Sequence, residues 1–224
     1  MRILFVFASE PEAGILLNIK DKSTFSDQFS FGGHEIVSLV TGVGGISTAW
    51  SLKQWLGTNP VPDLAINAGI AGSYKDEIKT GDVVIAETDC FADLGIESEG
   101  KIITLFEAGF SDPDEYPFSG GIIHCDNRFI EKAGMSLNKV KAATVNMCSA
   151  SAASISRIKN KFNPDIETME GATFFYICAR EKIPFLSVRA VSNKIVPGNR
   201  ESWNIPLALN SLAEKIKEIL LILN

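Results

Sequence analysis

The chain has 224 residues, of which 46% are hydrophobic and 21% are charged, so it can bury a sizeable core. We expect one domain over residues 1–224. The net charge of −6 argues against a nucleic-acid surface, because neutralising phosphates requires clustered Lys and Arg. No apolar run approaches the length of a membrane span, and the start MRILFVFASE is typical of a first strand rather than an export signal. These features favour a cytoplasmic protein with no nucleic-acid or membrane partner.

Cysteine and histidine usage gives no indication of a metal site. The four cysteines are widely spaced and form no Cys-x-x-Cys pair, which favours free thiols. His34 and His124 lie far apart and have no partner at ligand spacing. We therefore expect neither a bound metal nor a cofactor.

Strands and helices alternate along the chain, which predicts an α/β fold. Apolar runs rich in β-branched and aromatic residues predict strands at 3–7, 35–40, 64–67, 82–87, 141–145 and 185–191. Helical periodicity predicts helices at 46–56, 150–161, 171–180 and 206–222, the last with one apolar face that covers the sheet. The stretch 91–119 mixes acidic, glycine, proline and aromatic residues, which predicts an excursion of loops and short strands, often used for binding.

Ligands of open α/β sheets gather at the carboxyl ends of the strands, and unusual segments follow several of the predicted strands. ASEPEAG, residues 8–14, places Glu10 and Glu12 where a helix would start. The helix dipole favours such carboxylates, and a carboxylate there can also act as a general acid or base. Both readings stay open at this point.

Two glycine-rich segments follow later strands. TGVGGIST, residues 41–48, exposes amide groups at a helix start, as an anion site does, although it is neither a Walker loop nor a full dinucleotide fingerprint. NAGIAGS, residues 67–73, is expected to form a loop against which a flat ring could lie. Tight packing alone explains either segment equally well.

Two charged residues of the C-terminal half lie in apolar stretches of the sequence. Glu170 opens the apolar helix of IETMEGATFF, and Arg189 lies inside the strand that ends in Ser192 and Asn193. Burying either charge is costly unless it is hydrogen-bonded or paired. An ion pair and a site for substrate hydroxyls are both compatible with this pattern.

Taken in order, ASEPE, TGVGG, NAGIAG, KTGDVVIAE, ETMEGA and VRAVSN resemble the purine nucleoside phosphorylase and nucleosidase superfamily over nearly the whole chain. The resemblance implies a three-layer α/β/α sandwich around a mixed central sheet, assembled as a homo-oligomer such as a dimer or tetramer. Phosphorylases of this superfamily carry an Arg-containing phosphate loop where this chain has ASEPEAG. Water is therefore the expected attacking group, since a carboxylate repels phosphate and can deprotonate water.

The resemblance also implies roles at the sugar end of a small nucleoside substrate. Glu12 matches the glutamate that activates water in methylthioadenosine/S-adenosylhomocysteine nucleosidases. Glu170, with Met169 beside it, would hold the ribose. Arg189 would fix Glu170 or a neighbouring loop, or serve only as a structural ion pair.

At the base end, the resemblance places the purine against Gly72, Cys148 and Ser149, with Ser192 orienting it and Asn193 at its edge. Adenine-releasing nucleosidases carry Asp in place of Asn193, and that Asp protonates the purine N7. An amide cannot supply a proton, but it can hydrogen-bond a 6-oxopurine such as hypoxanthine.

The segments SNKIVPGNRESWNIP and ADLGIES…LFEAGFSD…YPF are most similar to futalosine hydrolases. This similarity implies hydrolysis of futalosine to hypoxanthine and dehypoxanthine futalosine in menaquinone biosynthesis. The alternatives are a methylthioadenosine/S-adenosylhomocysteine nucleosidase, a phosphorylase, and a non-enzymatic nucleoside-binding protein on the same fold. Lys194, Arg200 or a residue of a neighbouring subunit are candidates for the 5′ substituent, and the sequence does not select among them.

Overall fold

The computed structural model describes residues 1–19, 28–198 and 200–223, without the side chain of Arg200. The strands are β1 (Arg2–Phe7), β2 (Gln28–Phe31), β3 (His34–Val40), β4 (Leu64–Ser73), β5 (Val83–Asp89), β6 (Gly95–Ser98), β7 (Lys101–Thr104), β8 (Phe118–Ser119), β9 (Ile122–His124), β10 (Asn138–Thr144), β11 (Ile166–Thr168) and β12 (Phe185–Lys194). The helices are α1 (Glu10–Ala13), α2 (Gly45–Thr58), α3 (Arg128–Gly134), α4 (Ala152–Phe162), α5 (Gly171–Arg180) and α6 (Ile205–Ile222), with 3-10 turns η1 (Gly14–Asn18) and η2 (Arg200–Ser202).

The main sheet is mixed and partly closed. Its strands follow the order β2-β3-β1-β4-β11-β10-β5-β9-β8, and β12 pairs with both β4 and β5. The strands β4, β12, β5, β10 and β11 therefore form a closed circuit. β12 runs parallel to β4 over the whole of its length, which brings these two strand ends together.

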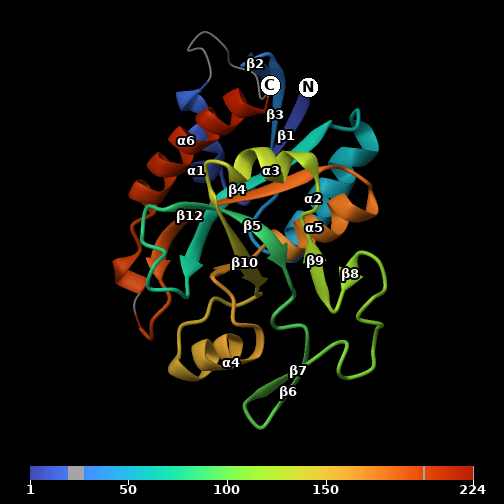
Figure 1. Ribbon diagram of the computed structural model, residues 1–224, viewed down its shortest axis with the longest axis vertical. Helices are drawn as coiled ribbons and strands as arrows, with labels where there is room; N and C mark the ends of the chain where they lie inside the picture. Colours follow the sequence, from blue (N-terminus) through green and yellow to red (C-terminus); the bar gives the residue numbers. More distant parts are fainter. Residues whose placement is uncertain (20–27, 199, 224) are drawn as a thin grey trace.

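Helices cover the sheet on both sides, as Figure 1 shows: α2 and α5 lie on one side, and α1 and α6 on the other. The expected three-layer α/β/α arrangement around a mixed sheet is confirmed. The run Ile3–Phe7 is completely buried, as is typical of a strand covered on both faces. On α6, Leu212, Ile216, Ile219 and Leu220 are buried, so that the apolar face of the helix packs on the sheet.

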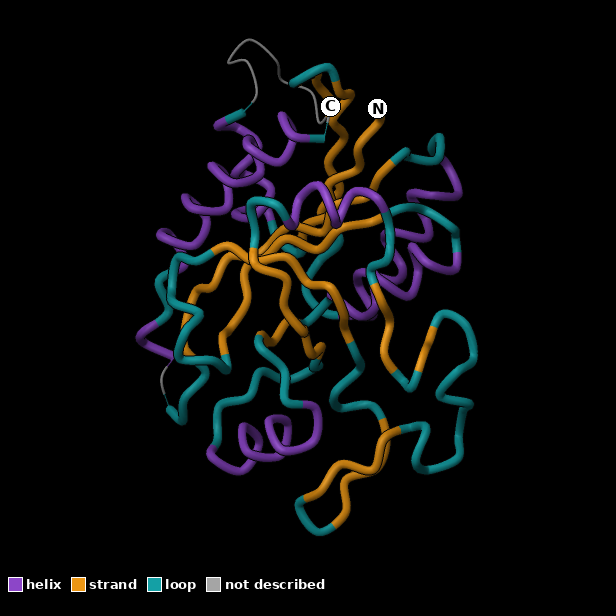
Figure 2. Tube along the Cα trace, in the orientation of Figure 1, coloured by secondary structure: helices purple, strands orange, loops and turns teal. Residues whose placement is uncertain are grey.

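Figure 2 shows that much of the loop structure lies at the end of the molecule opposite the two termini. The excursion expected at 91–119 contains the hairpin β6–β7 and the short strand β8. Within the described residues, no helix has both the length and the apolar character needed to cross a bilayer.

The predicted strands and helices are all present, with shifted ends. One expectation is wrong: residues 67–73 are not a loop, because β4 continues to Ser73. Their small side chains allow β4 to pair closely with β11 and β12 at this end of the sheet. The sequence also gave no sign of α3 or of the short strands β2, β9 and β11.

Candidate active site

A pocket of about 310 Å³ lies at the carboxyl ends of β1, β4 and β12. The expected site residues on its wall are Glu12, Gly72, Cys148, Met169, Glu170, Ser192 and Asn193. Arg189 and Ser149 do not line it. The lining also includes several apolar residues, namely Pro11, Val43, Trp203, Ile205 and Leu209.

Glu12 is held on two sides by groups of the protein. It belongs to the short helix α1, which starts at Glu10 after the extended Ser9, with Pro11 in its first turn. The Ser9 hydroxyl donates to Oε2 at 2.9 Å, and the Ile70 backbone N–H donates to Oε1 at 3.0 Å. Each carboxylate oxygen has a second acceptor site, so Glu12 can still accept from a ligand or a water in the pocket.

Gly69 is the point where Glu12 and Arg189 both approach β4. A Cβ at this position would lie 2.5 Å from Glu12 Oε1 and 2.6 Å from Arg189 Nη1. Such distances are much shorter than ordinary van der Waals contacts. A side chain at this position would therefore displace the ends of Glu12 and Arg189.

Arg189 is 1% exposed and does not line the pocket. Its guanidinium donates to Asn67 Oδ1 and, at 3.2 Å, to Ser187 Oγ. The Asn67 amide in turn donates to the Val6 carbonyl at 2.9 Å. Arg189 thus connects β12, β4 and β1, and it acts on the pocket through its charge.

Glu170 links two of the segments that the sequence singled out. It precedes α5 as its N-cap residue, and its Oε1 accepts from the Gly44 backbone N–H at 2.9 Å. The anion at the TGVGG segment is therefore a carboxylate of the protein itself. Burial raises the pKa of Glu170, while the charge of Arg189 and the Gly44 hydrogen bond oppose that rise.

Asp89, at the end of β5, is a buried carboxylate that sequence reasoning missed. Its Oδ1 accepts from the Thr144 hydroxyl and the Cys90 backbone N–H, while Oδ2 has no hydrogen-bond partner among the described residues. A Cβ at Gly171 would lie 2.1 Å from Oδ2, so the carboxyl sits against the first turn of α5. Burial raises the pKa of Asp89 to about 7.

Ser192 and Asn193 lie at an irregularity in β12. Val191 pairs with Ala71 and Asn193 with Gly72, so Ser192 is an extra residue in the ladder. Bulges of this kind redirect side chains near active sites. The Ser192 hydroxyl donates to Asn193 Oδ1 at 2.8 Å. The Asn193 Nδ2 group donates to the Lys194 carbonyl at 3.4 Å. Its second N–H is the donor that Asn193 can offer to a ligand, and Oδ1 keeps one acceptor site.

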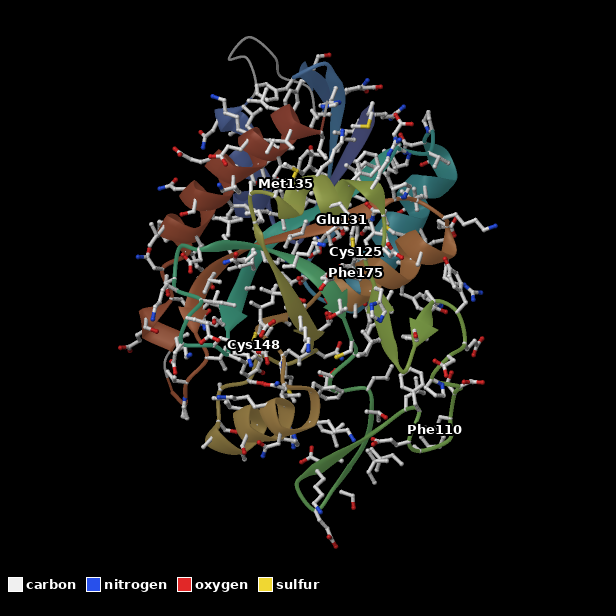
Figure 3. The ribbon with its side chains drawn as sticks, in the orientation of Figure 1. Phe110, Cys125, Glu131, Met135, Cys148 and Phe175 are labelled. Carbon is white, nitrogen blue, oxygen red and sulfur yellow. The ribbon has the colours of Figure 1, made fainter. Side chains whose placement is uncertain are left out.

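The loop after β10 brings Cys148 to the pocket wall. Cys148 is exposed, and its sulfur lies 3.5 Å from that of Met169. Figure 3 shows Cys148 between the strand ends and α4. The Ser149 backbone N–H donates at 2.8 Å to Glu167, which lines the pocket and was not singled out from the sequence.

The described residues include no group of three or more His, Cys, Asp or Glu side chains arranged to hold a metal ion. The chemistry that the pocket offers is that of carboxylates, an oriented amide and backbone groups. Glu12, Glu170 and Asn193 all line the pocket, and carboxylates together with an amide suit a ligand that carries hydroxyl groups and a heterocycle.

The sequence profile of the phosphorylase superfamily matches residues 2–223. The chain belongs to this superfamily. Futalosine hydrolases of Streptomyces coelicolor and Thermus thermophilus are each 27% identical, over 70% and 84% of this chain and 65% and 82% of theirs. The 5'-methylthioadenosine/S-adenosylhomocysteine nucleosidase of Aeromonas salmonicida is 26% identical over 98% of this chain and 99% of its own.

The fold is shared with solved structures of the superfamily. The nucleosidase from S. pneumoniae, solved with a transition-state inhibitor, superimposes with a TM-score of 0.84 at 22% identity and covers 100% of both chains. The relatives support an N-glycosyl hydrolase that acts on a small nucleoside. Their similar identities do not separate the two kinds of substrate.

Replacing Gly69 by Ala should lower the free energy of unfolding by about 1–3 kcal/mol, because the added methyl group would displace Glu12 Oε1 and Arg189 Nη1 from their places beside β4. Equilibrium denaturation with urea measures this loss. Gly57→Ala is the matched control, since nothing lies within 4 Å of a Cβ at that helical position. Equal stability of both variants would show that Gly69 is not sterically required.

The raised pKa of Asp89 predicts that the free energy of unfolding depends on pH. An unfolded Asp has a pKa near 3.9, so the folded state binds more protons between about pH 4 and the folded value of about 7. The contribution of Asp89 to stability therefore falls as the pH rises through this range. Asp89→Asn removes this titration. In thermal unfolding, the midpoint of the variant relative to that of the wild type should therefore be higher at pH 8 than at pH 5. If the midpoints of variant and wild type differ by the same amount at both pH values, the raised pKa of Asp89 is contradicted.

Proposed function

We propose that the protein hydrolyses the N-glycosidic bond of futalosine and releases hypoxanthine and dehypoxanthine futalosine, a step of menaquinone biosynthesis. The observation that carries the choice of base is the orientation of Asn193. Futalosine hydrolases among the relatives are consistent with this choice. The expected homo-oligomer, the single domain and the cytoplasmic location stay predictions.

The base argument depends on which edge of the purine meets the amide. N7 and O6 of a 6-oxopurine are both acceptors, whereas adenine presents an acceptor at N7 and a donor at its 6-amino group. The Ser192 hydrogen bond to Oδ1 fixes the orientation of the amide, and in our proposal Asn193 turns an N–H of Nδ2 toward this edge. A donor there matches both acceptors of hypoxanthine and opposes the 6-amino donor of adenine.

Departure of the base leaves negative charge on the purine and positive charge on the sugar. The Asn193 amide would stabilise the leaving base by donating to N7, without transferring a proton. Glu12 would hold the attacking water and remove its proton as the C1′–N9 bond breaks and the water oxygen bonds to C1′. The departed purine anion would then take a proton from solvent and become hypoxanthine. Glu170 would accept from a ribose hydroxyl, and its carboxylate would also favour the developing positive charge of the sugar.

A second candidate is the release of adenine from a methylthio nucleoside, and one observation favours it. The 5′ substituent of futalosine carries a carboxylate, yet no Lys, Arg or His is among the described residues that line the pocket. Lys194 pairs instead with Asp76 at 2.7 Å. The apolar side chains among the lining residues suit a methylthio group. In our proposal, the carboxylate of futalosine is bound outside this pocket.

Glu12→Gln should lower kcat for futalosine by at least about 10²–10⁴-fold, because an amide cannot take a proton from water. Release of hypoxanthine, followed by chromatography, measures the rate. Glu10→Gln is the control, because Glu10 lies on the same turn but does not line the pocket. Turnover of Glu12→Gln near the wild-type rate would exclude Glu12 as the general base.

The choice of substrate is tested by comparing kcat/KM for futalosine and for methylthioadenosine. We expect the wild type to prefer futalosine. Asn193→Asp should lower the ratio of kcat/KM for futalosine to kcat/KM for methylthioadenosine by at least about tenfold. The reason is that the carboxyl group replaces an amide donor and can protonate the N7 of adenine. Asn193→Ala should slow both substrates. A wild type that prefers methylthioadenosine would establish the second candidate instead.

A further inference from the structure

The start of α5 is capped in an unusual way. Glu170 occupies the N-cap position, yet within the described residues its side chain makes no capping hydrogen bond, and its Oε1 accepts from Gly44 instead. An N-cap side chain ordinarily accepts from the second or third N–H group of its own helix. The N–H groups of Gly171 and Ala172, the first two residues of α5, have no acceptor within the helix. Both residues are buried, so other side chains have to supply the acceptors.

Two threonine hydroxyls take over this cap. Thr168, at the end of β11, accepts from the Gly171 N–H at 3.3 Å. Thr144, at the end of β10, accepts from the Ala172 N–H at 2.7 Å. The two hydroxyl oxygens lie 3.1 Å apart, because β10 and β11 are parallel and pair Thr144 with Thr168 in register. The sheet therefore brings both acceptors to the start of the helix.

Asp89 fixes the direction in which these hydroxyl protons point. A hydroxyl group has one proton to donate and two lone pairs to accept with. Thr144 donates its proton to Asp89 Oδ1 at 2.9 Å, so its oxygen is left to accept from Ala172 and from Thr168. Thr168 then donates to Thr144 and keeps its lone pairs for the N–H of Gly171. One carboxylate thus sets both threonines as acceptors for α5.

Asp89 also lies directly against the first turn of α5. A Cβ at Gly171 would be 2.1 Å from Asp89 Oδ2 and 2.8 Å from Thr168 Oγ1, so the glycine permits the close approach of both side chains. A negative charge is favoured at this end of a helix. Burial, and less strongly the charge of Glu170, raise the pKa of Asp89, so the two carboxylates are electrostatic neighbours.

We propose that Asp89 is a positioning residue for Glu170. Asp89 caps α5 through Thr144 and Thr168, so the Glu170 carboxylate is not needed as a cap and can face the pocket, where Gly44 holds it. Asp89 is not among the described residues that line the pocket, and it acts on the ligand only through the start of α5. This inference rests on the proposed contact between Glu170 and a ribose hydroxyl, and it deepens that role. Without Asp89, the threonine protons lose their fixed direction and Glu170 can turn back to cap its own helix.

A double-mutant cycle on kcat/KM for futalosine tests this coupling. Asp89→Ala alone should lower kcat/KM by about tenfold, the usual effect of losing one hydrogen bond. In a Glu170→Ala background the further loss should be less than about threefold, because no carboxylate is left to position. Asp82→Ala is the matched control at the opposite end of β5. Asp82 is exposed and accepts from the Lys79 N–H at 2.8 Å, and its loss should change kcat/KM by less than about twofold.

Thr144 provides a second pair of variants that leaves the buried carboxylate in place. Thr144→Val removes the hydroxyl that links Asp89 to α5 and should lower kcat/KM by about as much as Asp89→Ala. Thr144→Ser keeps the hydroxyl and should recover activity to within about threefold of the wild type. The affinity for free hypoxanthine, which has no ribose for Glu170 to contact, should be unchanged in every variant and shows that each is folded.

An Asp89→Ala loss of the same size with and without Glu170 would overturn the proposal, because Asp89 would then act independently of that carboxylate. Equal activities of Thr144→Val and Thr144→Ser would also overturn it. A wild type that cleaves methylthioadenosine but not futalosine would refute the proposed substrate alone. The same cycle measured on methylthioadenosine, which carries the same ribose hydroxyls, would then decide the role of Asp89.

Discussion

The buried guanidinium of Arg189 connects the central strands of the sheet through hydrogen bonds. Its hydrogen bond to Asn67, which itself donates to the Val6 carbonyl, ties β12, β4 and β1 to one another. The same positive charge offsets part of the cost of burying carboxylates close by, because it lowers the pKa values of both Glu170 and Asp89 against the effect of burial. Without this charge, the wall of the pocket would concentrate negative groups that burial disfavours.

The geometry of the sheet accounts for the way in which the proposed function uses one small pocket for a base and a sugar. The circuit of β4, β12, β5, β10 and β11 forces strand ends together, and the extra residue Ser192 turns the end of β12 so that the Asn193 amide is held by its neighbour. Fixing the amide in advance means that a ligand does not have to order it on binding. Base selectivity in this account therefore comes from rigid sheet positions, while the sugar meets carboxylates held by Ser9, Ile70 and Gly44.

Most of the strands and helices, and most of the residues that line the pocket, could be predicted from the sequence. The same physical reasons explain which of them could not. Buried strands such as β1 appear as continuous apolar runs, and α6 appears as a periodic stripe, so both were found. The prediction of a loop at residues 67–73 is wrong, because small residues that permit close strand pairing have the same composition as a turn. Glu167 and Asp89 were missed because β11 is too short to show a period, and the burial of Asp89 against Gly171 arises only in the folded chain.

The central claim is that water attacks the sugar carbon of a 6-oxopurine nucleoside in this pocket. The most direct measurement is turnover of futalosine in 18O-labelled water without phosphate, followed by mass spectrometry of both products. The account predicts unlabelled hypoxanthine and a dehypoxanthine product that carries the label on the sugar. Turnover that requires added phosphate, or an absence of hypoxanthine under conditions where methylthioadenosine is cleaved, would contradict it.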